Sequence, residues 1–153
     1  MKKVFLIVTL FIFSSNIIMF AQQHKTQNSK LKIENAWARP AVKYSNSAMY
    51  FVIVNNSTKA DTLLGAESKA AEEVEVHESF KKDNDRMGMR PAGKLAIQPK
   101  SKLEFAPGGF HVMFLGVAKD FKMGDKIDVV LVLKYGGKIK VKAEVRDMPT
   151  KQN

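Results

Sequence analysis

The segment PGGFHVMFLGV, residues 107–117, reads as a turn followed by a buried strand, except that His111 and Met113 interrupt the apolar run. Side chains on a strand alternate between its two faces, so these two residues should share one face, about 7 Å apart at the root. The opposite face would then be apolar, consisting of Phe110, Val112 and Phe114. We therefore expect a strand whose second face offers an imidazole and a thioether that could converge on one ion.

Similar short runs recur along the chain between turn signals, and no segment shows sustained helical periodicity. One run, ESKAAEEV (67–74), could form a short helical turn. Seven to nine strands at this spacing predict an all-β antiparallel sandwich or barrel. The expected strands are 31–38, 47–56, 61–67, 72–80, 94–99, 102–107, 110–117, 126–135 and 138–146.

The first 21 residues have the order of a secretory signal peptide: a basic start, an apolar stretch and a small residue, Ala21, before a polar run. A retained membrane anchor is the alternative, whereas the lack of cysteine excludes a lipid-anchored lipoprotein. We expect an exported, periplasmic protein with a polar leader (22–30), one domain (31–147) and a polar tail (148–153).

The formal charge of +10 becomes +8 without the signal peptide, because Lys2 and Lys3 are lost and no acidic residue is. The lysines are spread along the chain, which indicates a solvated surface rather than a nucleic-acid site. An acidic partner protein or an anionic membrane surface stays open. Since the chain has no cysteine, about 130 residues must fold on an apolar core alone, without thiol catalysis, cysteine-bound zinc or blue copper.

The chain has three histidines and eight methionines. His77 should lie opposite the valines of its strand, and RMGMRP places Met87 and Met89 at positions i and i+2. Imidazole and thioether together favour Cu(I) over hard cations. The alternative is that these histidines and methionines are incidental. The methionines outside the pattern are interpreted as core filler: Met49, Met123 and Met148.

The spacing of His77, Met89, His111 and Met113 resembles the H-x10-M-x21-H-x-M signature of the periplasmic copper chaperones called PCuAC. The stretches ENAWARP, EVEVHE, MGMRP and FAPGGFHVMFLGV are also similar, so the resemblance covers roughly residues 31–147. It implies a cupredoxin-like Greek-key β-sandwich or barrel. It also implies that these four residues bind Cu(I).

The chain departs from that signature in two places. Eleven residues, not ten, separate His77 from Met89, and we place the extra one in the KKDND loop. The intact spacing of twenty-one favours Met89 over Met87 as the ligand. The methionine that often follows the first histidine by two residues is Ser79 here.

The resemblance implies a non-enzymatic carrier, expected to be a monomer, that passes Cu(I) to a copper-accepting protein. That acceptor would be a cytochrome c oxidase subunit, for its dinuclear copper centre, or a thioredoxin-like copper protein, so any membrane contact would be through the partner. Two rivals are a copper-sequestering resistance protein and an exported β-sandwich interaction module without metal. Separately, cleavage after Ala21 would place His24 third in the mature chain, where an N-terminal Cu(II) site could form unless Gln22 cyclises.

Overall fold

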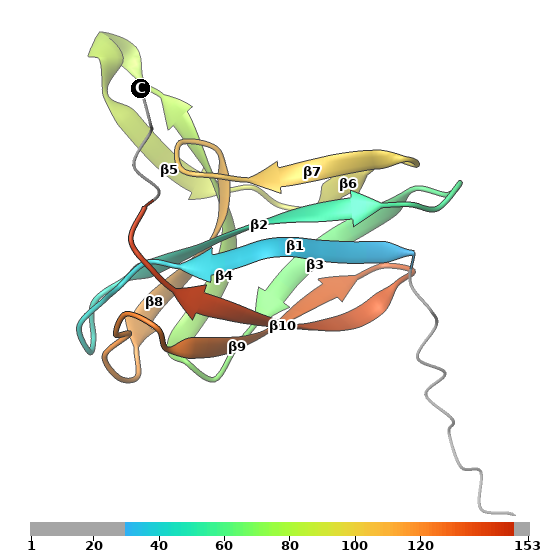
Figure 1. Ribbon diagram of the computed structural model, residues 1–153. Coiled ribbons are helices and arrows are strands. Elements are labelled where there is room, and N and C mark those ends of the chain that lie inside the picture. Colours follow the sequence, from blue (N-terminus) through green and yellow to red (C-terminus); the bar gives the residue numbers. More distant parts are fainter. Residues whose placement is uncertain (1–29, 149–153) are drawn as a thin grey trace, which may run out of the picture.

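Alternation of apolar and polar residues produces ten strands in residues 30–148, the part of the chain that this computed structural model describes (Figure 1). They are β1 (Leu31–Ala38), β2 (Ser47–Asn55), β3 (Asp61–Glu67), β4 (Ala71–Lys81), β5 (Met87–Pro91), β6 (Leu95–Ile97), β7 (Ser101–Phe105), β8 (Phe110–Val117), β9 (Lys126–Leu133) and β10 (Gly137–Val145). One 3-10 turn, η1 (Asp83–Asp85), lies between β4 and β5.

All nine expected strands are confirmed, and β5 is the additional one. Its sequence, MGMRP, contains glycine and proline and follows a turn rich in Asp and Asn, so local propensity favours a loop. Pairing with β4 makes it a strand. The prediction of a helical turn over 67–74 is wrong. Strand β3 runs to Glu67 and β4 begins at Ala71, so only a tight turn separates them.

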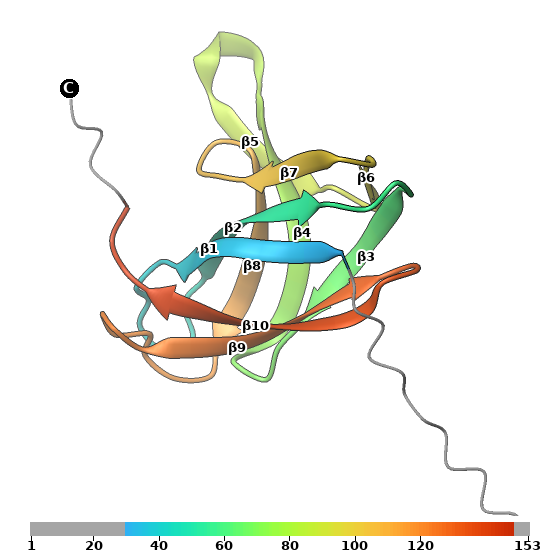
Figure 2. The same ribbon diagram turned by 45° about the vertical axis from the view of Figure 1, so that its right-hand side comes forward.

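The strands form one sheet in the order β5-β4-β8-β7-β2-β1-β10-β9-β3-β6, with β8 also pairing with β2. Nearly all pairings are antiparallel, as expected, whereas β1 with β10 and the single pair joining β7 and β8 are parallel. Figures 1 and 2 show the sheet folded over on itself, with the β4–β5 hairpin projecting beyond the other strands. This hairpin carries two of the methionines that the sequence singles out.

The inner faces of the folded sheet enclose the main apolar core. Phe51 stacks on Phe105 with ring centroids 4.3 Å apart, and Phe114 meets Phe121 edge to face at 5.6 Å. Met49 is fully buried there, as expected of core filler. Each such side chain contributes about 1.5–3 kcal/mol by leaving water, and this core stabilises a chain that has no disulfides.

A second, smaller cluster lies outside this core and consists of Trp37, Ala48 and Tyr50, with Met113 packed against it. A β-bulge in β1 creates it, since β1 has one more residue than β2 between Glu34 and Trp37. Without the extra residue, Trp37 would point inward like Ile33. Instead it faces outward beside Tyr50, with ring centroids 4.7 Å apart.

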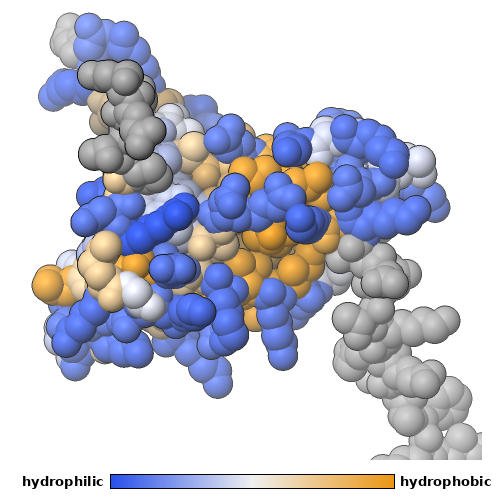
Figure 3. Space-filling view, viewed as in Figure 1, coloured by the Kyte–Doolittle hydropathy of each residue, from blue (hydrophilic) through white to orange (hydrophobic). Residues whose placement is uncertain are grey.

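Polar side chains cover much of the surface, in keeping with the basic composition. Figure 3 shows a largely hydrophilic face with an apolar area over β1, β2 and β10 that charged side chains cross. Within residues 30–148 no helix is long and apolar enough to cross a membrane.

Candidate metal centre

His77 of β4 and His111 of β8 lie directly opposite each other in the antiparallel pair. Residues opposite each other in such a pair have their side chains on the same face of the sheet. The two imidazole centroids are 5.9 Å apart. His111 is 3% exposed and the His77 side chain 14%, so the sheet holds two nearly buried imidazoles side by side.

Met113 shares this face because it follows His111 by two residues on β8. Its neighbours across the sheet are Ala48 of β2 and Glu75 of β4. Packing against the outer aromatic cluster holds this thioether beside the imidazoles. The other face of β8 is apolar as expected, with Val112 and Phe114 fully buried in the core and Phe110 packed against it.

Met89 reaches the same face from β5. It pairs with Ser79, two residues after His77, whereas Met87 pairs with Lys81, two residues farther toward the hairpin tip. Because a strand rises about 3.3 Å per residue, Met87 starts about 7 Å farther from the histidine pair. Both methionines are 59% exposed, so exposure does not distinguish them.

A cavity of about 390 Å³ opens at this face and is lined by His111, Met113 and Met89. Met87 does not line it, and neither does His77, which packs against His111. Residues of β2 and of the loop between β1 and β2 also line the cavity, among them Arg39, Ala48 and Tyr50.

A backbone carbonyl sets the tautomer of His111. Its Nδ1 lies 3.1 Å from the carbonyl oxygen of Gly109, which also accepts a hydrogen bond from the backbone N–H of Ser79. A carbonyl can only accept, so Nδ1 carries the proton and Nε2 is left with a lone pair. Nε2 is buried and has no hydrogen-bond partner in the structure.

The Glu75 carboxylate fixes the tautomer of His77, but through Nε2 rather than Nδ1. Glu75 Oε2 lies 2.6 Å from Nε2 of His77 and can only accept, which leaves the lone pair on Nδ1. That atom is also buried without a hydrogen-bond partner. Buried, unpaired polar atoms are costly and rare. Carboxylates and carbonyls that orient imidazole lone pairs are typical of metal-binding histidines, so both rings fit a metal ion.

The turn before β8 is what positions the Gly109 carbonyl. The N–H of Gly109 donates to the carbonyl of Ala106, with a distance of 2.9 Å from nitrogen to oxygen. Gly108 has φ +85°, as the third residue of a type II turn after proline requires. The Pro-Gly-Gly turn therefore positions the carbonyl that keeps the proton of His111 on Nδ1.

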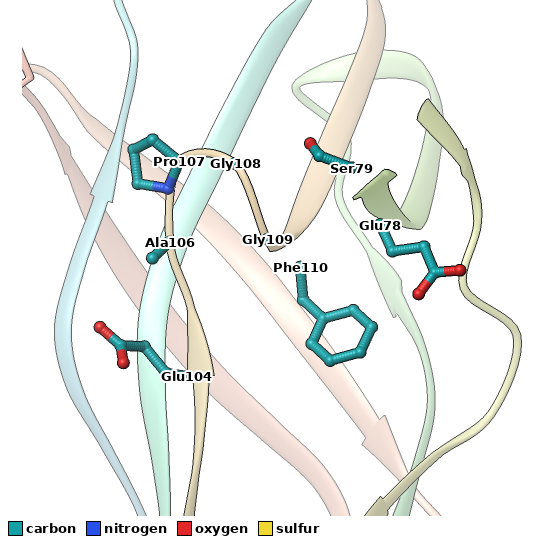
Figure 4. Close-up of a pocket in the computed structure, with 8 residues that line it drawn as sticks. All are labelled: Glu78, Ser79, Glu104, Ala106, Pro107, Gly108, Gly109 and Phe110. Carbon is teal, nitrogen blue, oxygen red and sulfur yellow. The ribbon is translucent and has the colours of Figure 1, made fainter. Parts of the chain in front are cut away.

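A second, shallower pocket of about 400 Å³ lies beside this turn (Figure 4). Its carboxylates, Glu78 and Glu104, lie on either side of Phe110, and Glu78 is ion-paired with Arg90. Across residues 30–148 no group of three or more His, Asp or Glu side chains is arranged to hold a metal ion. The donors that share this face of the sheet are two imidazoles and thioethers, a soft set suited to Cu(I).

Burial lowers the pKa of His111 below the usual value for histidine. The hydrogen bond to Gly109 works in the opposite direction, and the neighbouring His77 adds to the lowering. His111 therefore stays neutral, and able to bind a metal, to a lower pH than free imidazole. Burial likewise raises the pKa of Tyr50, so its hydroxyl is uncharged at neutral pH.

All four residues of the predicted ligand set lie on one face of the sheet, whereas His24 falls outside the described residues. Sequence reasoning missed the groups around them: Glu75, the Gly109 carbonyl, Trp37 and Tyr50. Glu75 was detectable, since it precedes His77 by two residues on the same face. Pro-Gly-Gly does signal the turn, but not the contact that its Gly109 carbonyl makes with His111. The aromatic cluster depends on the bulge in β1, which has no clear local signal and turns Trp37 outward beside Tyr50.

Comparison with known proteins places the domain in a family. The model of the LpqE-like family, described as "Putative lipoprotein LpqE-like", matches residues 31–145. A protein of Leifsonia xyli subsp. xyli named "Putative lipoprotein Lxx21020" is 28% identical over 127 residues, which span 83% of this chain and 76% of that protein.

Two solved structures share the fold. The copper-bound PCuAC domain from PmoF2 is 25% identical with a TM-score of 0.62, covering 76% of this chain and 92% of that domain. The apo PCuAC domain from PmoF1 is 26% identical with a TM-score of 0.65, covering 76% and 93%. The chain therefore belongs to the LpqE-like family, and its β domain has the fold of the PCuAC domains.

Proposed function

We propose that this protein is an exported copper carrier that binds one Cu(I) ion through Nδ1 of His77, Nε2 of His111 and the thioethers of Met89 and Met113. The observation that carries the proposal is the pair of buried imidazole nitrogens without hydrogen-bond partners, on the sheet face that also presents both methionines. The copper bound to the PCuAC domain of PmoF2 supports the same substrate here.

The donor set explains the choice of ion. Thioether sulfur is soft and uncharged, which suits Cu(I) and adds little for zinc or the hard cations. Both imidazoles are held in a fixed tautomer by groups behind them, so the lone pairs are oriented before the ion arrives. A site made of neutral donors can release a monovalent ion by stepwise exchange.

Exposure of the donors indicates the order of exchange. Met89 is 59% exposed, whereas His111 is almost completely buried. A thiolate from an acceptor, such as a cytochrome c oxidase subunit or a thioredoxin-like copper protein, would therefore replace Met89 first and the histidines last. The sheet need not open for this sequence of steps.

A Cu(I) competition titration tests the binding step. The wild-type domain should bind one equivalent, and the double variant His111→Ala, Met113→Ala should lose about 100-fold or more in affinity because one nitrogen and one sulfur donor are gone. A Met123→Leu variant, altered at an exposed methionine that does not line the cavity, should bind as wild type does. If the double variant, still folded by circular dichroism, binds equally well, these residues are not the ligands, and the alternative of an exported interaction module without this metal site is favoured.

Delivery needs a separate experiment. The Cu(I)-loaded domain is mixed with an apo acceptor that presents a cysteine pair, and the copper content of each protein is measured after separation. A carrier transfers its ion within minutes. Retention of copper by the domain would indicate sequestration instead.

A further inference from the structure

Met148 lies outside the four-residue motif, yet its side chain lines the same cavity as Met89, His111 and Met113. It is 50% exposed and belongs to neither apolar cluster, so its interpretation as core filler is wrong. Met123 is 57% exposed, and the same interpretation is wrong there, but Met123 does not line the cavity. Met148 therefore needs an explanation that core packing does not supply.

The segment after β10 is anchored two residues before Met148. Strand β10 runs parallel to β1, with Val145 opposite Ala38, and the N–H of Arg146 donates to the carbonyl of Ala38 at 3.0 Å. The Arg146 guanidinium lies over the Trp37 ring, with 5.3 Å between Cζ and the ring centroid. These two contacts direct the chain out of β10 and along the outer face.

The aromatic cluster links that anchor to the candidate site. The Trp37 ring packs on Tyr50, whose ring centroid is 6.3 Å from that of His111. The chain leaving β10 turns toward the side of the molecule that carries the β4–β5 hairpin (Figure 1). Met148 lines the cavity together with Met89 of β5.

We propose that Met148 supplies a third thioether to the Cu(I) ion, so that the segment after the last strand is part of the copper site. This rests on the proposed function. The ion is a soft acceptor, and a further neutral sulfur adds affinity without adding charge. Because Met148 lies beyond β10, it can move away without breaking a ladder hydrogen bond, so it would leave even before Met89, the first of the four motif donors to be exchanged.

Methionine-to-leucine substitutions test this, since leucine keeps a similar apolar volume and removes only the sulfur. Met148→Leu should weaken Cu(I) binding about tenfold, the lower end of what loss of a supporting group costs a metal site. X-ray absorption of the Cu(I)-loaded protein should show one sulfur fewer than in wild type. Met123→Leu, at a methionine of similar exposure away from the cavity, should change neither quantity.

The outcomes separate the two proposals. If wild type binds Cu(I) and Met148→Leu matches it in affinity and in sulfur count, the role of Met148 is overturned and the four-residue site stands. If wild type binds no Cu(I), the proposed function itself fails. Apo thermal unfolding of both leucine variants near the wild-type temperature shows that any loss of affinity is not a loss of fold.

Discussion

At the scale of single residues, the candidate site depends on groups outside the proposed ligand set. The Gly109 carbonyl keeps the proton of His111 on Nδ1, and the Glu75 carboxylate keeps that of His77 on Nε2. One lone pair on each ring is thereby left facing no partner. Sequence spacing identifies the two histidines. Which ring nitrogen keeps a lone pair for a metal ion follows only from these contacts in the structure.

Gly108 provides a test of the turn. Its φ of +85° costs an alanine about 1–2 kcal/mol of folding free energy, although nothing crowds the position where Cβ would lie. Gly108→Ala should therefore lower the free energy of unfolding by about that amount in a urea titration, and weaken Cu(I) binding through the displaced Gly109 carbonyl.

The neighbouring glycine is the matched control. At Gly109 an added Cβ would meet the Ala106 carbonyl at 3.5 Å, an ordinary contact, and φ is not positive. Gly109→Ala should consequently be close to wild type in both measurements. Equal losses in the two variants would show that the turn conformation is not what matters.

The lowered pKa of His111 gives a direction for pH dependence. A proton and Cu(I) compete for the same imidazole lone pair, so affinity is constant above the pKa of His111 and falls as the pH drops through it. We expect no change in Cu(I) affinity between pH 8 and 7, and a measurable loss by pH 5 that sets in at a lower pH than for free imidazole, because the pKa of His111 is lowered. A titration that is flat from pH 7 to pH 5 contradicts histidine ligation.

At the scale of elements, the β4–β5 hairpin gives its two methionines different positions relative to the cavity. Met87 and Met89 are equally exposed and face the same way, but only Met89 lines the cavity. Sequence alone could not show that MGMRP is a strand, because its glycine and proline are typical of loops. Register against β4 is what gives the two methionines different distances from the histidine pair.

Leucine substitutions at these positions give a paired prediction. Met89→Leu should weaken Cu(I) binding about tenfold or more through loss of a sulfur donor, as measured by competition with a chromophoric Cu(I) chelator. Met87→Leu should stay within about threefold of wild type, inside the context-dependent scatter of a neutral change. The reverse ranking would assign the ligand to Met87.

Strand β8 shows how much of the element level could be predicted. Period-two alternation correctly placed Val112 and Phe114 in the core and His111 and Met113 on the other face. The same rule fails for Trp37, because one extra residue in β1 reverses its direction. A bulge depends on pairing with β2, so a single strand's sequence does not reveal it.

At the scale of the whole molecule, one sheet folded over a large apolar core holds donors from β4, β5 and β8 on a single outer face. The all-β class follows from the sequence, because apolar alternation and turn residues recur along the chain. That the segment after β10 lines the same cavity does not follow from the sequence, since Met148 is far along the chain from Met89 and Met113 and its position depends on the Arg146 anchor.

The central claim is that one Cu(I) ion binds at the face shared by His77, Met89, His111 and Met113. Methyl-labelled methionine NMR during a Cu(I) titration tests it most directly, because each methionine reports separately. The methyl signals of Met89 and Met113 should shift and saturate at one equivalent. Those of the buried Met49 and of Met123, which does not line the cavity, should stay in place. Unmoved Met89 and Met113 signals at one equivalent of Cu(I) would contradict the proposed site.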